Sequence, residues 1–257
     1  MPDFINNLLN WRRVNFQQFV AQEQQLINHL TGEQMTVLDE IREINRLFGS
    51  RPHHIEQIAQ RINDLHPNYN NGDLHLLNDA ARAISNQNEN ISTASFTLAT
   101  RLCAYHNLVA YPLYDILIEK LIIRLREQHH YLPNATEIRR EAGILHNVYD
   151  DLRDISGFQT ISYKDMYDVI HTLAFIKFYQ TINHRYNGNV LPQHNFISPI
   201  LRSIVFMGVY NRIDIQNINL IIINFQRNGI YDAIAEIVDS AIDEERRLQR
   251  RNHNQRI

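Results

Sequence analysis

The chain has 257 residues, 44% of them hydrophobic, and a formal net charge of −3 at pH 7, which excludes the strongly basic overall balance of many nucleic-acid-binding proteins. Its single cysteine, Cys103, excludes an intramolecular disulfide framework. Its eight glycines are fewer than the turns of an all-β chain require, so the composition favours helices. A local basic patch stays compatible with this composition.

Apolar residues spaced three or four positions apart predict amphipathic helices along the first third of the chain. Pro52 opens one of these helices, which stops before Pro67, and Gly49 stands where a C-cap glycine would end the helix before it. The segments 68–73 and 86–90, rich in asparagine and other polar residues, predict loops. The predicted helices of this part cover residues 4–30, 36–48, the Pro52 segment and 74–84.

The same helical pattern continues through the rest of the chain. Ser92 or Thr93 is expected to cap the next helix, and Pro133 marks a break further along. The segment 187–199 predicts a long loop. Further helices are predicted to begin near residues 92, 115 and 136 and to cover 162–186 and 231–248, and the short apolar segments 201–209 and 218–225, which could be strands, are assigned to helices.

Together these elements predict a single all-α, multi-helix globular domain of roughly eight to ten helices over residues 1–245, followed by a basic, flexible tail over 246–257. The first residues lack the basic and apolar regions of a secretory signal. The longest apolar runs, such as 220–223, are far shorter than the roughly 20 residues that span a bilayer. We therefore expect a cytoplasmic protein without membrane contact.

The most distinctive segment reads Ala-Thr-Arg-Leu-Cys-Ala-Tyr-His-Asn over residues 99–107 and Tyr-Pro-Leu-Tyr-Asp over 111–115. It resembles a signature of uncharacterised helical proteins, which read Ala-Ser-Lys, an apolar pair, an aromatic residue, Asn-Pro and finally Phe-Pro-Ile-Tyr-Asp. Arg101 replaces the usual lysine, and Leu108 replaces the first proline. That signature is in turn distantly similar to the core of the helix-hairpin-helix DNA glycosylases, so the resemblance implies a glycosylase-like helical core with signature helices over about residues 92–128.

The resemblance also implies candidate site residues. In the glycosylases, an aspartate near the start of a helix stabilises charge that develops on the deoxyribose, and Asp115 stands at the matching position. Arg101 would then contact a phosphate, while His106 and Tyr111 would line the same cleft. These residues favour a nucleic-acid-binding protein, with DNA or RNA as its partner and with Asp115, Arg101 and His106 as the catalytic candidates.

Two departures weaken the case for glycosylase chemistry. Thr97 stands where bifunctional members carry the lysine that forms a Schiff base, and threonine cannot do so. The segment 91–98 contains no glycine, although the DNA-holding hairpin uses glycines to bring backbone amides to a phosphate. Only a monofunctional reaction, with Asp115 assisting water, stays compatible with this pattern.

Structural explanations compete with the catalytic one. Asp115 follows Pro112 at a predicted helix start, where an aspartate most often serves as the N-cap, and we weight this explanation above catalysis. Arg101 and Asp115 could also form a partly buried ion pair with no chemical role. If the scaffold serves no chemistry, the chain is a non-enzymatic protein-interaction module with a protein partner.

A third hypothesis uses Arg101 and His106, whose Arg-x4-His spacing resembles the metal-independent ribonuclease motif of HEPN-type helical proteins. Those sites assemble across a homodimer. Leu102 stands where that motif prefers a polar residue, and a histidine at a helix end more often interacts with the helix dipole.

The remaining charged and histidine-rich patterns predict no metal or cofactor. Residues 150–154 match an Asp-Asp-x-x-Asp pattern that resembles the magnesium-diphosphate site of isoprenoid synthases, but the chain lacks a convincing second motif, so we interpret it as a solvated acidic face. No histidine pair has metal-ligand spacing, and no glycine-rich phosphate loop is present. The basic C-terminal arginines are candidates for contact with nucleic acid or an acidic partner: Arg246, Arg247, Arg250 and Arg251.

Overall fold

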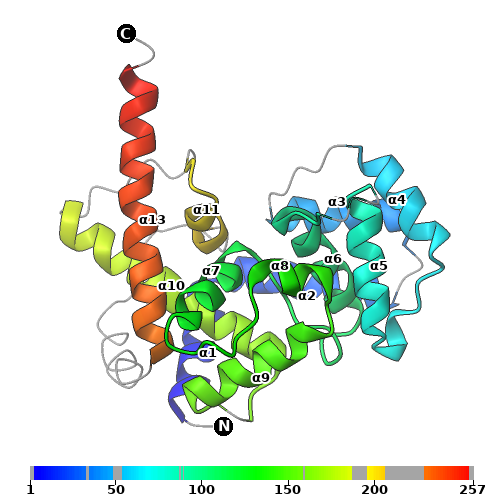
Figure 1. Cartoon of the computed structure of the whole chain (residues 1–257), viewed down its shortest axis with the longest axis horizontal. Helices are drawn as coiled ribbons and strands as arrows, with labels where there is room; N and C mark the ends of the chain where they lie inside the picture. The colour runs from blue at the N-terminus through cyan, green and yellow to red at the C-terminus, as the bar shows by residue number, and fades with distance from the viewer. Residues whose placement is uncertain are drawn as a thin grey trace.

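The computed structural model describes residues 3–32, 35–48, 54–86, 88, 90–158, 160–186, 196–205 and 229–254. Over these residues the fold is all-α, with twelve α-helices, one short 3-10 helix and no strand (Figure 1). The predicted fold class is therefore confirmed. None of the described helices is long and apolar enough to cross a membrane.

The elements follow the chain in a simple order. They are α1 (Asp3–Asn15), α2 (Gln17–Gly32), α3 (Val37–Phe48), α4 (Ile55–Asp64), η1 (Tyr69–Asn71), α5 (Leu74–Ile84), α6 (Thr93–His106), α7 (Ile116–Arg126), α8 (Ala135–Arg140), α9 (Ile144–Ser156), α10 (Tyr163–Tyr186), α11 (Pro199–Val205) and α13 (Gly229–Asn254).

The long helix α10 organises one half of the molecule, where α1, α7, α9, α11 and α13 pack against it. The other half is built by α2 to α6, with α6 packed on α2, α3 and α5 (Figure 1). Helix α6 also contacts α7, which joins the two halves. Hydrophobic side chains fill the core where these helices meet. Those with no exposed surface include Leu102, Tyr114, Leu121, Ile170 and Leu173.

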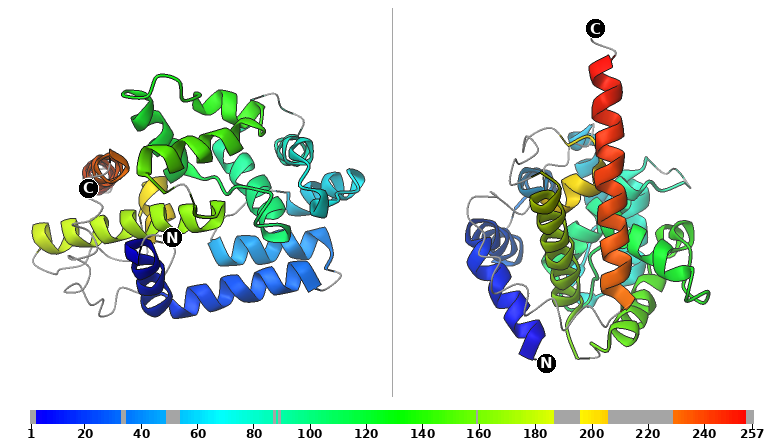
Figure 2. Two further views of the ribbon diagram at one scale, coloured as in Figure 1. Left: turned by 90° about the horizontal axis from the view of Figure 1, so that it is seen from below. Right: turned by 90° about the vertical axis from the view of Figure 1, so that its left-hand side faces the viewer.

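Two predicted helices are each divided in the structure, which is why the described residues hold more helices than expected. Residues 4–30 bend between α1 and α2 at Phe16, whose buried ring packs edge-on against Trp11 and Phe175 (Figure 2). The predicted helix from residue 136 breaks between α8 and α9. There the backbone N–H of Ala142 donates to the side chain of Asn78.

The C-terminal part of the chain partly matches the sequence predictions. Helix α11 confirms the helical assignment of 201–209 over its described residues, whereas 218–225 lies outside the described residues. The predicted tail over 246–257 continues α13 as helix to Asn254. The helix stands out from the body of the molecule at this end (Figures 1 and 2).

Candidate functional site

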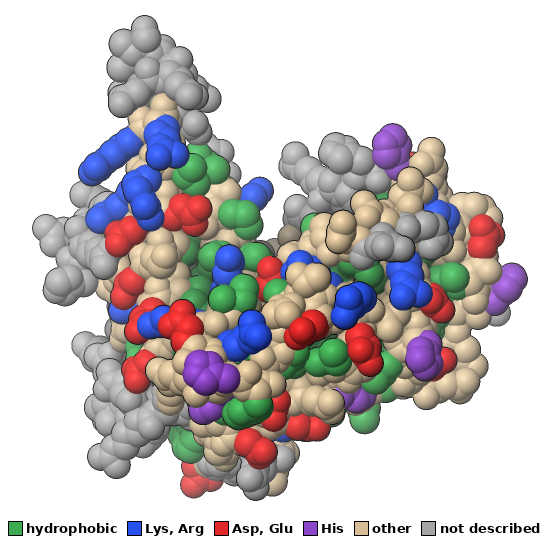
Figure 3. Space-filling model, in the orientation of Figure 1, with side chains coloured by type: hydrophobic (Ala, Val, Ile, Leu, Met, Phe, Trp, Pro, Cys, Tyr) green, Lys and Arg blue, Asp and Glu red, His purple; other side chains and the backbone are tan. Residues whose placement is uncertain are grey.

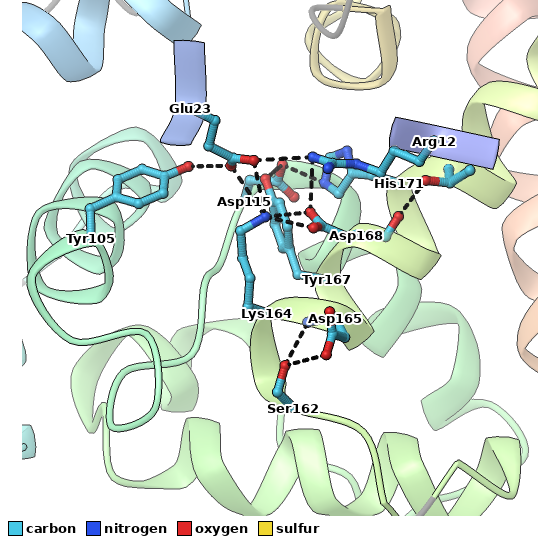
Figure 4. Close-up of polar contacts among 11 residues, drawn as sticks. Arg12, Glu23, Tyr105, Asp115, Ser162, Lys164, Asp165, Tyr167, Asp168 and His171 are labelled. Atoms are coloured by element: carbon cyan, nitrogen blue, oxygen red, sulfur yellow. Dashed lines mark hydrogen bonds and ion pairs between the residues drawn. The ribbon is translucent and has the colours of Figure 1, made fainter. Parts of the chain in front are cut away.

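Charged side chains from three helices and a tyrosine from a fourth meet inside the molecule (Figure 4). Arg12 of α1, Glu23 of α2 and Lys164 and Asp168 of α10, with the hydroxyl of Tyr105 of α6, form what we call the buried charge cluster. Their charges balance, with two cations against two carboxylates. Each of the four charged side chains is at most 13% exposed.

Every charge in the buried charge cluster has an opposite charge nearby. The guanidinium of Arg12 lies 3.2 Å from a carboxylate oxygen of Glu23 and 3.1 Å from one of Asp168. The ammonium of Lys164 lies 2.6 Å from Asp168 and 3.2 Å from Glu23. Tyr105 Oη donates to Glu23 Oε1 at 2.8 Å. Such pairing is what allows ions to stay charged away from water.

The cluster changes the acidity of Glu23. Burial alone would raise the pKa of its carboxyl, but the charges of Lys164 and Arg12 and the hydrogen bond from Tyr105 lower it to about 2. The carboxylate therefore stays ionised at all ordinary pH values.

Asp115 directly precedes α7 and lies beside the buried charge cluster, 2% exposed. Its Oδ1 accepts hydrogen bonds from the backbone N–H groups of Leu117 at 3.0 Å and Ile118 at 3.1 Å. This is the geometry of an N-cap, so the structural explanation predicted for Asp115 is confirmed.

The second carboxylate oxygen of Asp115 is occupied as well. Its Oδ2 accepts from the hydroxyls of Tyr167 at 3.0 Å and Ser203 at 2.7 Å, and it lies 2.9 Å from Nε2 of His171. Burial alone would raise the pKa of Asp115, but His171, Arg101 and the Ser203 hydroxyl lower it below its usual value. The side chain is therefore an interior acceptor that joins α7, α10 and α11.

Arg101 faces this interior. It is 7% exposed, and its Nη2 lies 4.0 Å from Asp115 Oδ2, as the ion-pair explanation predicts. The guanidinium carbon lies 3.8 Å from the ring centroid of Phe48, and the side chain is hydrogen-bonded to Tyr167. A phosphate would have to displace these neighbours to reach Arg101.

The other residues of the predicted cleft face elsewhere. His106, at the end of α6, lies 3.3 Å from Glu40 through Nε2 and stacks on Tyr69 with ring centroids 4.0 Å apart. Tyr111 is buried and donates to the backbone carbonyl of Asp73 at 3.3 Å. The predicted site residues of this segment therefore have separate partners: Arg101 contacts Asp115, His106 contacts Glu40, and Tyr111 contacts Asp73. The Arg-x4-His pair of the ribonuclease hypothesis contacts two different sets of partners.

The C-terminal arginines have a different setting. We call Arg246, Arg247, Arg250 and Arg251 of α13 the basic end. None of the four is buried, and Figure 3 shows Lys and Arg side chains gathered where α13 stands clear of the body. Arg246 lies 3.7 Å from Asp243, and Arg247 Nε donates to the backbone carbonyl of Asp243. Over the described residues, Arg250 and Arg251 form no ion pair.

A shallow groove of about 460 Å³ lies beside the middle of α13, between α7, α11 and α13. Ile123, Ile200 and Ile237 supply its apolar lining. Three carboxylates and two cations share its charged lining, namely Glu127, Glu236, Glu244, Lys120 and Arg124. Arg124 pairs with both Glu127 and Glu236, so no excess positive charge draws a phosphate into the groove.

Nothing in the described part of the chain forms a group of three metal-ligating side chains. Within residues 150–154, Asp150 and Asp154 are exposed on α9, and Asp150 pairs with Arg153 at 2.8 Å. This arrangement fits the solvated acidic face that the sequence favours.

Comparison with known proteins found no matching family model, curated protein or solved structure. The similarity to helix-hairpin-helix glycosylases therefore stays a prediction.

The sequence predictions missed the buried charge cluster, although a signal for it was present. Arg12 stands between Leu8 and Phe16 at helical spacing, and Glu23 stands between Phe19 and Leu26. A charged residue within an apolar stripe faces the core, where it needs a partner.

Proposed function

We propose that the chain is a nucleic-acid-binding protein that contacts phosphates through the basic end of α13. The proposal assigns binding to this surface and a structural role to Asp115 and the buried charge cluster. The predicted partner class, nucleic acid, is unchanged. The proposed binding surface is the exposed end of α13 instead of a cleft between the signature helices.

The observation that carries the proposal is the separation of charge along α13. The helix carries its acidic residues up to Glu245, and from Arg246 to Asn254 it has four arginines and no acidic residue. Arg42 and Arg46 of α3 each have an acidic neighbour that offsets them, namely Asp39 and Glu43. In the basic end Asp243 offsets Arg246 in the same way, whereas Arg250 and Arg251 form no ion pair over the described residues. The basic end is therefore a local positive surface on a chain whose net charge is −3.

The burial of Asp115 argues against a catalytic role for its carboxylate. Both of its carboxylate oxygens accept hydrogen bonds from the protein, and the side chain is 2% exposed. A general base or charge stabiliser must come within hydrogen-bond reach of the reacting atoms. A nucleic acid would have to separate α7 from α10 and α11 to achieve this.

The test is a binding titration of labelled 20-base-pair DNA at a series of salt concentrations. Four phosphate contacts give a salt slope of up to about −3.6, because each neutralised phosphate of a B-form duplex contributes about −0.9. Affinity is then expected to fall roughly 150-fold from about 50 to about 200 mM salt. Replacing all four arginines of the basic end by glutamine should remove most of this dependence.

The matched control replaces four exposed arginines elsewhere by glutamine, namely Arg42, Arg46, Arg82 and Arg126. Both variants change the net charge by the same amount. Retained binding in the control and loss in the basic-end variant would support the proposal. Equal loss in both variants would show a general charge effect, and binding by neither the natural chain nor the control would overturn the proposal.

A further inference from the structure

We infer that the ligand of the basic end is duplex DNA and that the end of α13 enters its major groove. This inference rests on the proposed function and narrows it to one class of nucleic acid. It depends on the shape of α13 together with its charge.

The first argument is the length of helix that stands free. Glu245 is the last buried side chain among those of α13 that the structure describes, which end at Arg251, and the helix continues to Asn254. Nine residues of α-helix, from 246 to 254, span about 13 Å at about 1.5 Å per residue. The major groove of B-form DNA is about 8.5 Å deep and about 12 Å wide, and an α-helix with its side chains is about 10–12 Å across. The free end therefore has the length and width to enter the groove.

The second argument is the placement of the arginines around the helix. Arg246 and Arg250 are four residues apart and form one column, while Arg247 and Arg251 form a second column about 100° around the axis. A helix in the major groove has a phosphate backbone on each side. Two columns of arginines can meet both backbones or reach the O6 and N7 atoms of guanine.

The acidic residues of α13 limit which part of the helix can contact DNA. Asp243 and Glu244 are exposed directly before the basic end, within one turn of Arg246, and Glu244 also lines the groove beside the middle of α13. Their charge repels phosphates, so contact is confined to the free end and excludes the body of the protein. Duplex RNA has a deep, narrow major groove that side chains cannot read, so it fits this helix end poorly.

The experiment compares duplex DNA, duplex RNA and single-stranded DNA of the same sequence and length as ligands of the full chain. We expect duplex DNA to bind at least about tenfold more tightly than duplex RNA. Methylation of guanine N7 by dimethyl sulfate reports the major groove, and we expect protection of N7 in the complex.

A pair of variants tests whether the helix itself is needed. Gln249→Pro keeps all four arginines but interrupts the helix within the basic end, because proline lacks the N–H and clashes with the preceding turn. Gln249→Ala keeps the helix and removes only the hydrogen bond from Gln249 to Glu245. We expect the proline variant to lose the preference for duplex DNA and the N7 protection, and the alanine variant to keep both. Far-ultraviolet circular dichroism and thermal melting of both variants check that the body is folded.

The outcomes distinguish the two proposals. Equal binding of the three nucleic acids, or binding without N7 protection, would overturn entry into the major groove and leave phosphate binding by the basic end intact. Duplex preference that survives in the folded Gln249→Pro variant would also overturn the inference. Binding to none of the three would overturn both proposals.

Discussion

Acid should weaken this fold through Glu23 in a way that can be calculated. The usual pKa of its carboxyl is 4.5, and in the folded protein it is lowered to about 2. Because the folded-state pKa is the lower one, the ionised carboxylate stabilises the fold fully above about pH 4.5, and this contribution is lost as the pH falls toward 2. A difference of about 2.5 pKa units at 1.36 kcal/mol each corresponds to about 3 kcal/mol.

The substitution Glu23→Gln isolates this contribution. Glutamine cannot ionise, so Arg12 and Lys164 are left with Asp168 as their only carboxylate in the cluster. Removal of one member of a buried ion network typically costs about 3–5 kcal/mol, which we expect as a loss of unfolding free energy at pH 7. Between pH 4.5 and 3, the variant should lose less further stability than the natural chain.

Urea unfolding followed by circular dichroism at pH 7, 5, 4 and 3 measures both effects. The control is Glu56→Gln, since Glu56 pairs with Arg42 at the surface with its side chain 70% exposed. That variant should stay within about 0.5 kcal/mol of the natural chain. If Glu23→Gln is as stable as the control at pH 7 and has the acid response of the natural chain, the reasoning about the buried charge cluster fails.

Two further predictions concern single positions. Asp115→Ala should lower the unfolding free energy by about 3–5 kcal/mol because the cap and a buried ion are both lost, whereas Asp115→Asn keeps a capping oxygen and should cost less. Urea titration measures this order, which a catalytic residue without a structural role would not produce. Gly72→Ala should lower the melting temperature, because Gly72 has φ +64° and an added Cβ would lie 2.8 Å from the Cβ of Ala110. An unchanged melting temperature would contradict the need for glycine there.

Helical periodicity predicted much of the fold because it depends on nearby residues. The helix over Leu74–Ile84 has the predicted bounds, and the N-cap roles of Ser92 and Asp115 follow from local sequence. The bend at Phe16 was not predictable in this way. Besides the nearby Trp11, the ring of Phe16 packs there against Phe175, which is 159 positions away along the chain.

The candidate site was harder to predict for the same reason. Nothing near Arg101 in the sequence indicates that it packs on Phe48 and hydrogen-bonds to Tyr167. The sequence therefore did not determine whether Arg101 is exposed, and so it did not determine whether Arg101 can contact a ligand. The four arginines of the basic end needed no tertiary partner to be noticed, because their clustering is visible in the sequence itself.

The residues of the buried charge cluster lie far apart in the sequence, and this separation affects folding kinetics. Glu23 and Lys164 are 141 positions apart, so their pairing closes a long loop, and the entropy of that closure must be lost before the contact forms. While the chain emerges during synthesis, Arg12 and Glu23 are the only charged members of the cluster until α10 arrives, and Tyr105 of α6 is the one further partner of Glu23 in the cluster. The interior should therefore become ordered late and in one step, and fragments that end before residue 164 should be prone to aggregation.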